Sequence, residues 1–171
     1  MPDVELPLAS GGATILSQRL TNHRGAVVLF WSGMCAHCAR YDEYLNTFEQ
    51  RHPEIALLAI AARHTETLQQ IRLTVADRGL TFPIAHCADG RAAAGWQAPQ
   101  TPRAYLVDRH RMLRYRGAID NYKYRNDAAY AEYLEPAIDD FLHGRPIVRA
   151  ETPSFGCAID SIYYALPRVT R

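Results

Sequence analysis

The chain has 171 residues, of which 48% are hydrophobic, and a formal net charge of +1. This length suits one domain with its own core and is short for two. The small net charge gives no reason to expect a nucleic acid partner, and no apolar run approaches the roughly 20 residues that cross a bilayer. Because the first residues lack the basic-then-apolar layout of a secretory signal, we expect a cytoplasmic protein, or a periplasmic one if an export segment is missing from this sequence.

Hydrophobic patterning divides the chain into short strands and helices. Continuous apolar runs rich in β-branched and aromatic residues predict buried strands, and apolar positions three and four apart predict helices. In chain order we expect a hairpin arm near 13–16, a strand at 26–31, a helix at 35–51, a strand at 55–61, a helix capped by Thr65 that ends before Gly79, a strand at 82–87, a helix at 91–96, a hairpin of 103–108 with 112–117, and a helix at 127–143 that is interrupted or kinked at Pro136.

The order of these elements predicts an α/β fold. Strands joined by helices of this length pair in parallel through right-handed crossovers, and the closing hairpin adds antiparallel strands. We therefore expect a mixed central β-sheet flanked by helices on both faces. Residues 1–144 should form one domain, with 145–171 as a tail packing on the same domain, and we expect a monomer.

Two of the four cysteines, Cys35 and Cys38, stand where the first buried strand meets a helix. Cysteines three apart share one helix face, so their sulfurs can meet at disulfide distance. As the first helical residue, Cys35 would face unpaired N–H groups, which lower the pKa of a thiol. Cys38, one turn deeper and less exposed, is suited to resolving a mixed disulfide. The pattern predicts thiol–disulfide exchange; the alternative, half of a zinc site, lacks a second ligand pair.

Two further features could act on this pair. His37, between the cysteines, can donate a hydrogen bond or positive charge to a Cys35 thiolate, which would make the disulfide a stronger oxidant. The alternative is a solvated histidine without effect. Thr101-Pro102 stands directly before the strand that begins at Arg103, where a proline removes a donor from the ladder. From the residues alone we expect an ordinary turn proline, because few X–Pro bonds in folded proteins are cis.

The segment from Phe30 to Cys38, Phe-Trp-Ser-Gly-Met-Cys-Ala-His-Cys, resembles the Phe-Trp-x-x-x-Cys-x-x-Cys of thioredoxin-like redoxins, the group of TlpA/ResA-like reductases and the AhpC/TSA superfamily. Later segments resemble the same family: Asp89-Gly90 with Gly95, Thr101-Pro102, Leu106-Val107-Asp108, and the run from Arg116 to Asp120. The run from Pro153 to Ile159 is similar to a Gly-Cys-x-Ile tail of one redoxin branch.

This resemblance implies a thioredoxin-like fold with an N-terminal hairpin arm and an extended C-terminal tail. It implies catalysis by Cys35 and Cys38 without an organic cofactor or metal, and a cis Thr101–Pro102 bond packed against them. The partners would be a disulfide- or dithiol-containing protein and an upstream thiol donor. The partner would contact Trp31, Met34, Thr101 and Pro102, and its chain would pair with the backbone of Thr101 near its disulfide.

The sequence also departs from the family pattern. Met34 stands where these proteins usually have tryptophan. Leu29 stands where thioredoxins keep a buried aspartate, and Glu66 is a candidate substitute for that proton acceptor. A peroxidase of the AhpC/TSA type is one alternative, with Ser32 at its hydroxyl position, but Val28 replaces its proline.

The remaining candidates are accessory thiols and a metal site. Cys87 is expected to be an inert buried cysteine. Cys157 could bridge to Cys87, or could relay electrons to the Cys35–Cys38 pair. A non-enzymatic copper-delivery redoxin would use that pair with a distant histidine, for which His86 is the best candidate.

Overall fold

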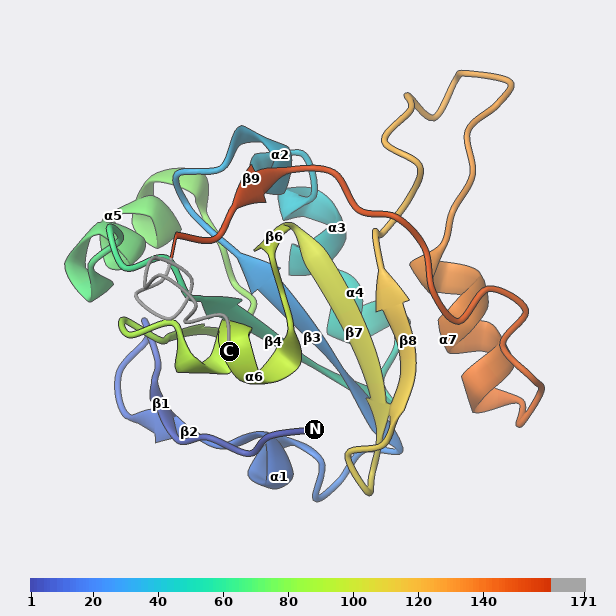
Figure 1. The fold of residues 1–171 in the computed structure, drawn as a ribbon, viewed down its shortest axis with the longest axis horizontal. Coiled ribbons are helices and arrows are strands. Elements are labelled where there is room, and N and C mark those ends of the chain that lie inside the picture. Colours follow the sequence, from blue (N-terminus) through green and yellow to red (C-terminus); the bar gives the residue numbers. More distant parts are fainter. Residues whose placement is uncertain (161–171) are drawn as a thin grey trace, which may run out of the picture.

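The computed structural model describes residues 1–160, and a five-stranded mixed sheet forms its centre. The strands follow the order β5-β4-β3-β7-β8 across the sheet (Figure 1). Their bounds are β3 Gly25–Trp31, β4 Ile55–Ala61, β5 Ile84–His86, β7 Arg103–Asp108 and β8 Leu113–Gly117. Strands β3, β4 and β5 run parallel, whereas β7 is antiparallel to both β3 and β8. The predicted mixed sheet is therefore confirmed.

Helices cover both faces of this sheet, and short strand pairs lie outside it (Figure 1). The helices are α1 Leu16–Arg19, α2 Ala36–Ala39, α3 Asp42–Asn46, α4 Phe48–Arg51, α5 Leu68–Arg78, α6 Arg91–Trp96 and α7 Leu134–Leu142. The N-terminal hairpin arm is the antiparallel pair of β1 (Leu6–Pro7) and β2 (Ala13–Thr14). A second antiparallel pair joins β6 (Gln100–Thr101) to β9 (Cys157–Ala158) from the tail.

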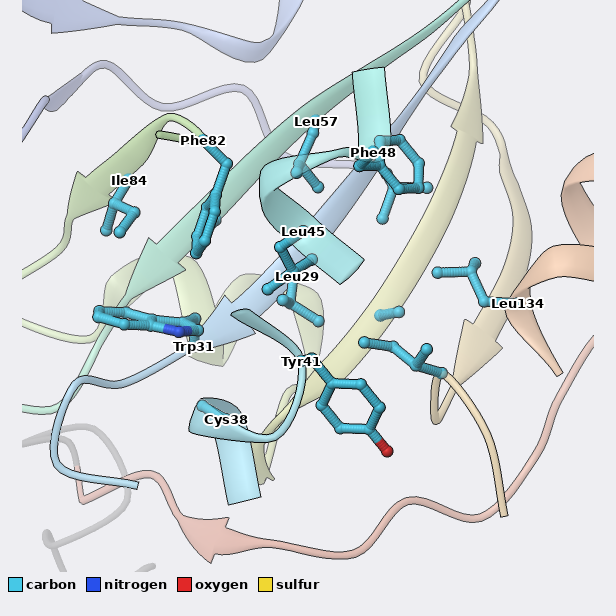
Figure 2. Packing of buried hydrophobic residues seen from close by; sticks show 14 of the residues in the cluster. Leu29, Trp31, Cys38, Tyr41, Leu45, Phe48, Leu57, Phe82, Ile84 and Leu134 are labelled. Atoms are coloured by element: carbon cyan, nitrogen blue, oxygen red, sulfur yellow. The ribbon is translucent and has the colours of Figure 1, made fainter. Parts of the chain in front are cut away.

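The two faces of the sheet carry two separate hydrophobic clusters. Successive side chains of a strand point to opposite faces. Val27, Leu29 and Trp31 of β3 therefore pack in one cluster, while Val28 and Phe30 pack in the other. The first cluster holds both cysteines of the pair and the apolar side of α3 and α4, as Figure 2 shows for Cys38, Tyr41, Leu45 and Phe48. Burial of side chains such as Leu45 and Phe48 stabilises the fold by roughly 1.5–3 kcal/mol each.

The helix predicted for 35–51 is broken into three short helices. Tyr41 and Thr47 leave the helical region, with ψ values of 10° and 2°. The hydroxyl of Tyr41 donates to the buried carboxylate of Asp120, at 2.6 Å. The hydroxyl of Thr47 donates to the carbonyl of Glu43, at 3.0 Å, a local bond that competes with regular helix geometry. Apolar spacing predicted the buried side correctly, but not these interruptions.

Helix α5 begins two residues later than predicted. Its cap is Thr67 rather than Thr65, and Thr67 forms a reciprocal capping box with Gln70. Glu66 consequently precedes the cap and is buried. The helix ends at Gly79, whose φ of 59° is the left-handed conformation that glycine adopts without steric cost.

The last helix is shorter than the predicted 127–143 and is not interrupted. It begins at Leu134, so that Pro136 falls in its first turn, where the missing N–H would have no intrahelical partner. The segment between β8 and α7 instead extends away from the body of the molecule (Figure 1).

From α7 the tail runs back past β8 to β6, where it forms β9 (Figure 1). It first lies along β8, where the amide of Arg116 donates to the Ala150 carbonyl and the amide of Thr152 donates to the Arg116 carbonyl. A Cβ at Gly117 would lie 2.0 Å from Thr152 Oγ1, so only glycine permits this crossing. Within the described residues, no helix is long and apolar enough to cross a membrane.

Candidate active site

The cysteine pair lies at the junction of β3 and α2. Strand β3 ends at Trp31, a tight turn follows, and the Cys35 amide donates back to the Ser32 carbonyl at 3.2 Å. Cys35 is the residue before the helix rather than its first helical residue, with φ −98° and ψ 111°. Its carbonyl accepts the amide of Cys38 at 2.9 Å, which places Cys38 one turn into α2.

The two thiols of the pair have opposite acidities. A hydrogen bond from the Cys38 thiol is the largest cause that lowers the pKa of Cys35 to about 4, against the opposing effect of burial. Hydrogen bonds from Cys157 and Thr101 lower it further. Burial, reinforced by the neighbouring Cys35, raises the pKa of Cys38 well above its ordinary value. At neutral pH these shifts place a thiolate on Cys35 beside a protonated Cys38 thiol.

These contacts correct the expected source of the acidity. The sequence predicted unpaired amides of a long helix, but α2 has four residues, and the pKa of Cys35 is lowered by two other cysteines and Thr101. A helix this short has a small dipole.

An ultraviolet titration of the reduced protein should detect this thiolate. Because the folded pKa of Cys35 is lowered to about 4, its thiolate absorbance should persist through neutral pH and disappear as the pH falls through that value. Cys35→Ser should remove this transition. An absorbance that changes only near the ordinary thiol pKa of about 8.5 would contradict the assignment.

Thr101 and Pro102 lie where the family resemblance implies. Their peptide bond is cis, and both residues are buried. The Thr101 carbonyl oxygen lies 3.3 Å from Cys35 Sγ, within reach of a protonated thiol donor. The β6 edge at Thr101 therefore borders the reactive sulfur.

The chain's own tail covers this edge. Strand β9 pairs antiparallel with β6, with Cys157 opposite Thr101 and Ala158 opposite Gln100, and Figure 1 shows β9 beside α2. Cys35 is 0% exposed, and Cys38 is 1% exposed. Both thiols of the pair are therefore shielded from solvent, because the tail, which the sequence pattern does not reveal, covers Cys35.

The predicted partner-contact residues separate into two groups. Met34 is 57% exposed, on the turn directly before Cys35. The prediction that Trp31 contacts the partner is wrong, because this side chain is fully buried. Its ring packs edge-on to Phe82 and beneath the Arg78 guanidinium, so it supports the site from inside. This placement follows from its position in β3, which is buried on both faces and whose odd positions pack in the cluster that holds the cysteine pair.

His37 contacts a residue that the sequence analysis did not select. Its Nδ1 hydrogen-bonds to the hydroxyl of Tyr122, and the two rings are 5.0 Å apart. The Arg40 guanidinium lies over the same Tyr122 ring, at 4.7 Å. An effect of His37 on the redox potential stays a prediction. Tyr122 is one of four tyrosines between positions 122 and 133, and this cluster is the sequence signal that could have indicated it.

Glu66 supports the turn before Cys35. Its Oε1 accepts the amide of Gly33 at 2.7 Å, while Oε2 is buried without a hydrogen-bond partner in the described part of the chain. Leu29 is fully buried in the core. The proposed role of Glu66 as proton acceptor for Cys38 stays a prediction, because its hydrogen bond is made to the turn at Gly33.

All four cysteines lie within the described residues and are free. Cys87 packs in the cluster on the other face of the sheet, where its thiol donates to Asp89 at 3.2 Å. Cys157 packs against the face that holds Cys35. The structure therefore does not contain the bridge between Cys87 and Cys157 that the sequence left open.

The residues named for the peroxidase and copper alternatives have other partners. Ser32 Oγ accepts the amide of Met34 at 3.2 Å, and Val28 packs in the opposite cluster. His86 Nε2 lies 2.8 Å from the Glu66 carbonyl. Among residues 1–160, no three His, Cys, Asp or Glu side chains are grouped as metal ligands.

A family comparison agrees with this geometry. The model of the AhpC/TSA family matches residues 1–116, more than half of the chain. The chain therefore belongs to the AhpC/TSA family. The match ends before the tail. No curated protein matches the chain.

Solved structures show the same fold. A hypothetical protein from Sinorhizobium meliloti 1021 superposes with a TM-score of 0.82 at 28% identity, covering 94% of this chain and 91% of that one. An uncharacterized conserved protein from Geobacillus kaustophilus gives 0.81 at 21% identity, covering 93% and 88%. A putative thiol:disulfide interchange protein DsbE from Chlorobium tepidum gives 0.60 at 19%, covering 67% and 79%. The thioredoxin-like fold is confirmed, and the chain is a redoxin of the oxidoreductase or peroxidase kind.

Proposed function

We propose that the protein is a thiol–disulfide oxidoreductase that works through Cys35 and Cys38. The observation that supports this most directly is the pairing of a thiol whose pKa is lowered to about 4 with a protonated thiol one helical turn away. A nucleophile that is ionised at neutral pH, next to a thiol that resolves its product, is what disulfide exchange requires.

The mechanism uses only these two sulfurs. The Cys35 thiolate attacks one sulfur of a substrate disulfide, a new S–S bond forms, and the other substrate sulfur leaves as a thiolate and takes a proton. Cys38 then loses its proton and attacks Cys35 Sγ, which breaks the mixed disulfide and releases the second substrate thiol. Two electrons have passed to the substrate, and the pair is a disulfide. An upstream thiol donor regenerates it, and the reverse sequence oxidises a dithiol.

The partners follow from this chemistry. The substrate is a protein or small molecule that carries a disulfide or a dithiol, and the pair needs no organic cofactor or metal. Met34, exposed beside Cys35, is the part of the site that an incoming partner meets first.

The reduction potential of the pair tests the proposal. The protein is equilibrated with glutathione buffers, alkylated and digested with trypsin, because Arg24 and Arg40 bound one fragment that holds both cysteines. We expect a two-electron transition within this fragment. A potential near or above roughly −200 mV indicates an oxidant, and one near or below about −270 mV a reductase.

The same samples contain their control. Cys87 lies in a different tryptic fragment, ending at Arg91, and should stay alkylated throughout. A pair that forms no disulfide at any glutathione ratio would overturn the proposed exchange activity. Rapid consumption of hydrogen peroxide by the reduced pair, without reaction with disulfides, would instead assign the peroxidase alternative.

A further inference from the structure

The tail occupies the place that a polypeptide partner would use. The family resemblance implies that the backbone of Thr101 pairs with a substrate chain near its disulfide. Here that backbone pairs with Cys157 of the same chain, and the Thr101 hydroxyl donates to the Cys157 carbonyl at 3.5 Å. The pairing presents a cysteine directly opposite Thr101, as a bound substrate would.

The approach of the tail to this edge is very close. A Cβ at Gly156 would lie 1.8 Å from the Thr101 carbonyl oxygen and 2.7 Å from its carbonyl carbon. Both obstacles are backbone atoms, so they cannot rotate away as a flexible side chain could. Glycine at this position is what lets the neighbouring Cys157 reach the reactive sulfur.

Further contacts hold the tail on both sides of Cys157. Gln100 Nε2 donates to the Ser154 hydroxyl oxygen at 3.0 Å, and Arg103 donates to the same oxygen at 2.8 Å. Beyond β9, the Ile159 amide donates to the Pro99 carbonyl at 2.9 Å, and Ile159 is 3% exposed. Hydrogen bonds on both the N-terminal and the C-terminal side of Cys157 therefore fix its position.

We propose, on the basis of the exchange activity proposed above, that Cys157 is a second resolving cysteine that forms a disulfide with Cys35 in competition with Cys38. While that disulfide exists, residues 154–158 are fastened over Thr101 and the edge is closed to a polypeptide. In this proposal Cys157 both reacts with Cys35 and, as part of β9, covers the β6 edge.

The proposed step balances in atoms and electrons. After Cys35 has attacked a substrate disulfide, the Cys157 thiol loses its proton and attacks Cys35 Sγ. A Cys35–Cys157 bond forms, the bond to the substrate breaks, and the substrate thiolate leaves and takes a proton. Cys38 can then attack Cys35 Sγ and release the Cys157 thiol, which gives the Cys35–Cys38 disulfide without any further oxidant.

The acidity of Cys157 agrees with this order of events. Burial, together with the hydrogen bond and charge of Cys35, raises the pKa of Cys157 to about 11 in the reduced protein. Once the Cys35 sulfur is part of a mixed disulfide, it carries no negative charge. The contribution of the Cys35 charge to the raised pKa of Cys157 is then lost, at the step in which the Cys157 thiolate has to attack.

Two matched variants test the proposal in the full chain. Both carry Cys38→Ser and Cys87→Ser, and one of them also carries Cys157→Ser; each is treated with oxidised glutathione and followed by intact mass. We expect the variant without Cys157 to hold one glutathione on Cys35. The variant that retains Cys157 should lose its glutathione at least about tenfold faster, because an intramolecular thiol attacks at high effective concentration.

The product identifies the reaction. In the variant that retains Cys157, trypsin should release fragment 25–40 joined by a disulfide to fragment 150–168. Equal adduct lifetimes without this cross-link would overturn the role of Cys157 and leave the exchange proposal standing. The positive control is a small free dithiol that reacts with the same oxidised glutathione. If this control reacts and both variants are folded, but neither variant forms a glutathione adduct, the exchange proposal itself fails.

Discussion

Replacing Cys35 by serine should lower the rate of disulfide reduction by at least about a thousandfold, because the thiolate is the nucleophile and a serine hydroxyl is not ionised at neutral pH. Cys35 makes the contacts that define the site: it accepts from Cys38 and Cys157, and its Sγ lies 3.3 Å from the Thr101 carbonyl. The measurement is the rate at which the reduced protein cleaves a small chromogenic disulfide.

Cys87→Ser is the matched control for this variant. Cys87 is as buried as Cys35, but it packs on the opposite face of the sheet and bonds to Asp89, so its replacement should leave the rate unchanged. Thermal unfolding of both variants verifies that they are folded. If a folded Cys35→Ser protein kept more than about a tenth of the activity, the nucleophile would lie elsewhere.

Gly156→Val should uncover Cys35 without removing any thiol. The Cβ that this substitution adds would lie 1.8 Å from the Thr101 carbonyl oxygen, so the tail must move off the β6 edge. A buried thiol reacts with a bulky reagent only through local opening. Maleimide labelling of the fragment that holds Cys35 should therefore accelerate by at least about tenfold, which corresponds to about 1.4 kcal/mol less opening free energy.

Val148→Ala provides the comparison for this variant. Val148 belongs to the same tail but is 89% exposed, so truncating it should change neither the path of the tail nor the labelling rate. An unchanged labelling rate in a folded Gly156→Val protein would show that the tail does not limit access to Cys35. Faster labelling of Cys87 as well would indicate general destabilisation instead.

The local part of the site could be predicted from the sequence. The apolar run from Ala26 to Trp31 forms β3, and cysteines three apart after a strand share one face of the following turn of helix. Both features depend on backbone geometry over a few neighbouring residues. The prediction of a buried strand holds for Trp31 as well, whereas the family resemblance, which implied a partner contact there, is wrong for this fully buried side chain.

The points at which helices begin and break could be predicted less well from the sequence. The break at Tyr41 accompanies a hydrogen bond to Asp120, which lies 79 positions away in the chain. Thr67 rather than Thr65 caps α5 because Gln70 completes its capping box, leaving Glu66 buried beneath Gly33. Competing caps of similar chemistry are decided by such contacts.

By itself, the sequence determined the alternating strands and helices, the mixed sheet and the placement of Cys35 and Cys38 one helical turn apart after β3, because periodicity and short spacing act locally. Only the tertiary structure decided that Cys157 lies against Cys35 and covers it. The two residues are far apart in the chain, and their meeting depends on two close backbone approaches, at Gly117 to Thr152 and at Gly156 to Thr101. The acidity of Cys35 follows from that meeting, since hydrogen bonds to a thiolate lower its pKa only once the donors are brought to it.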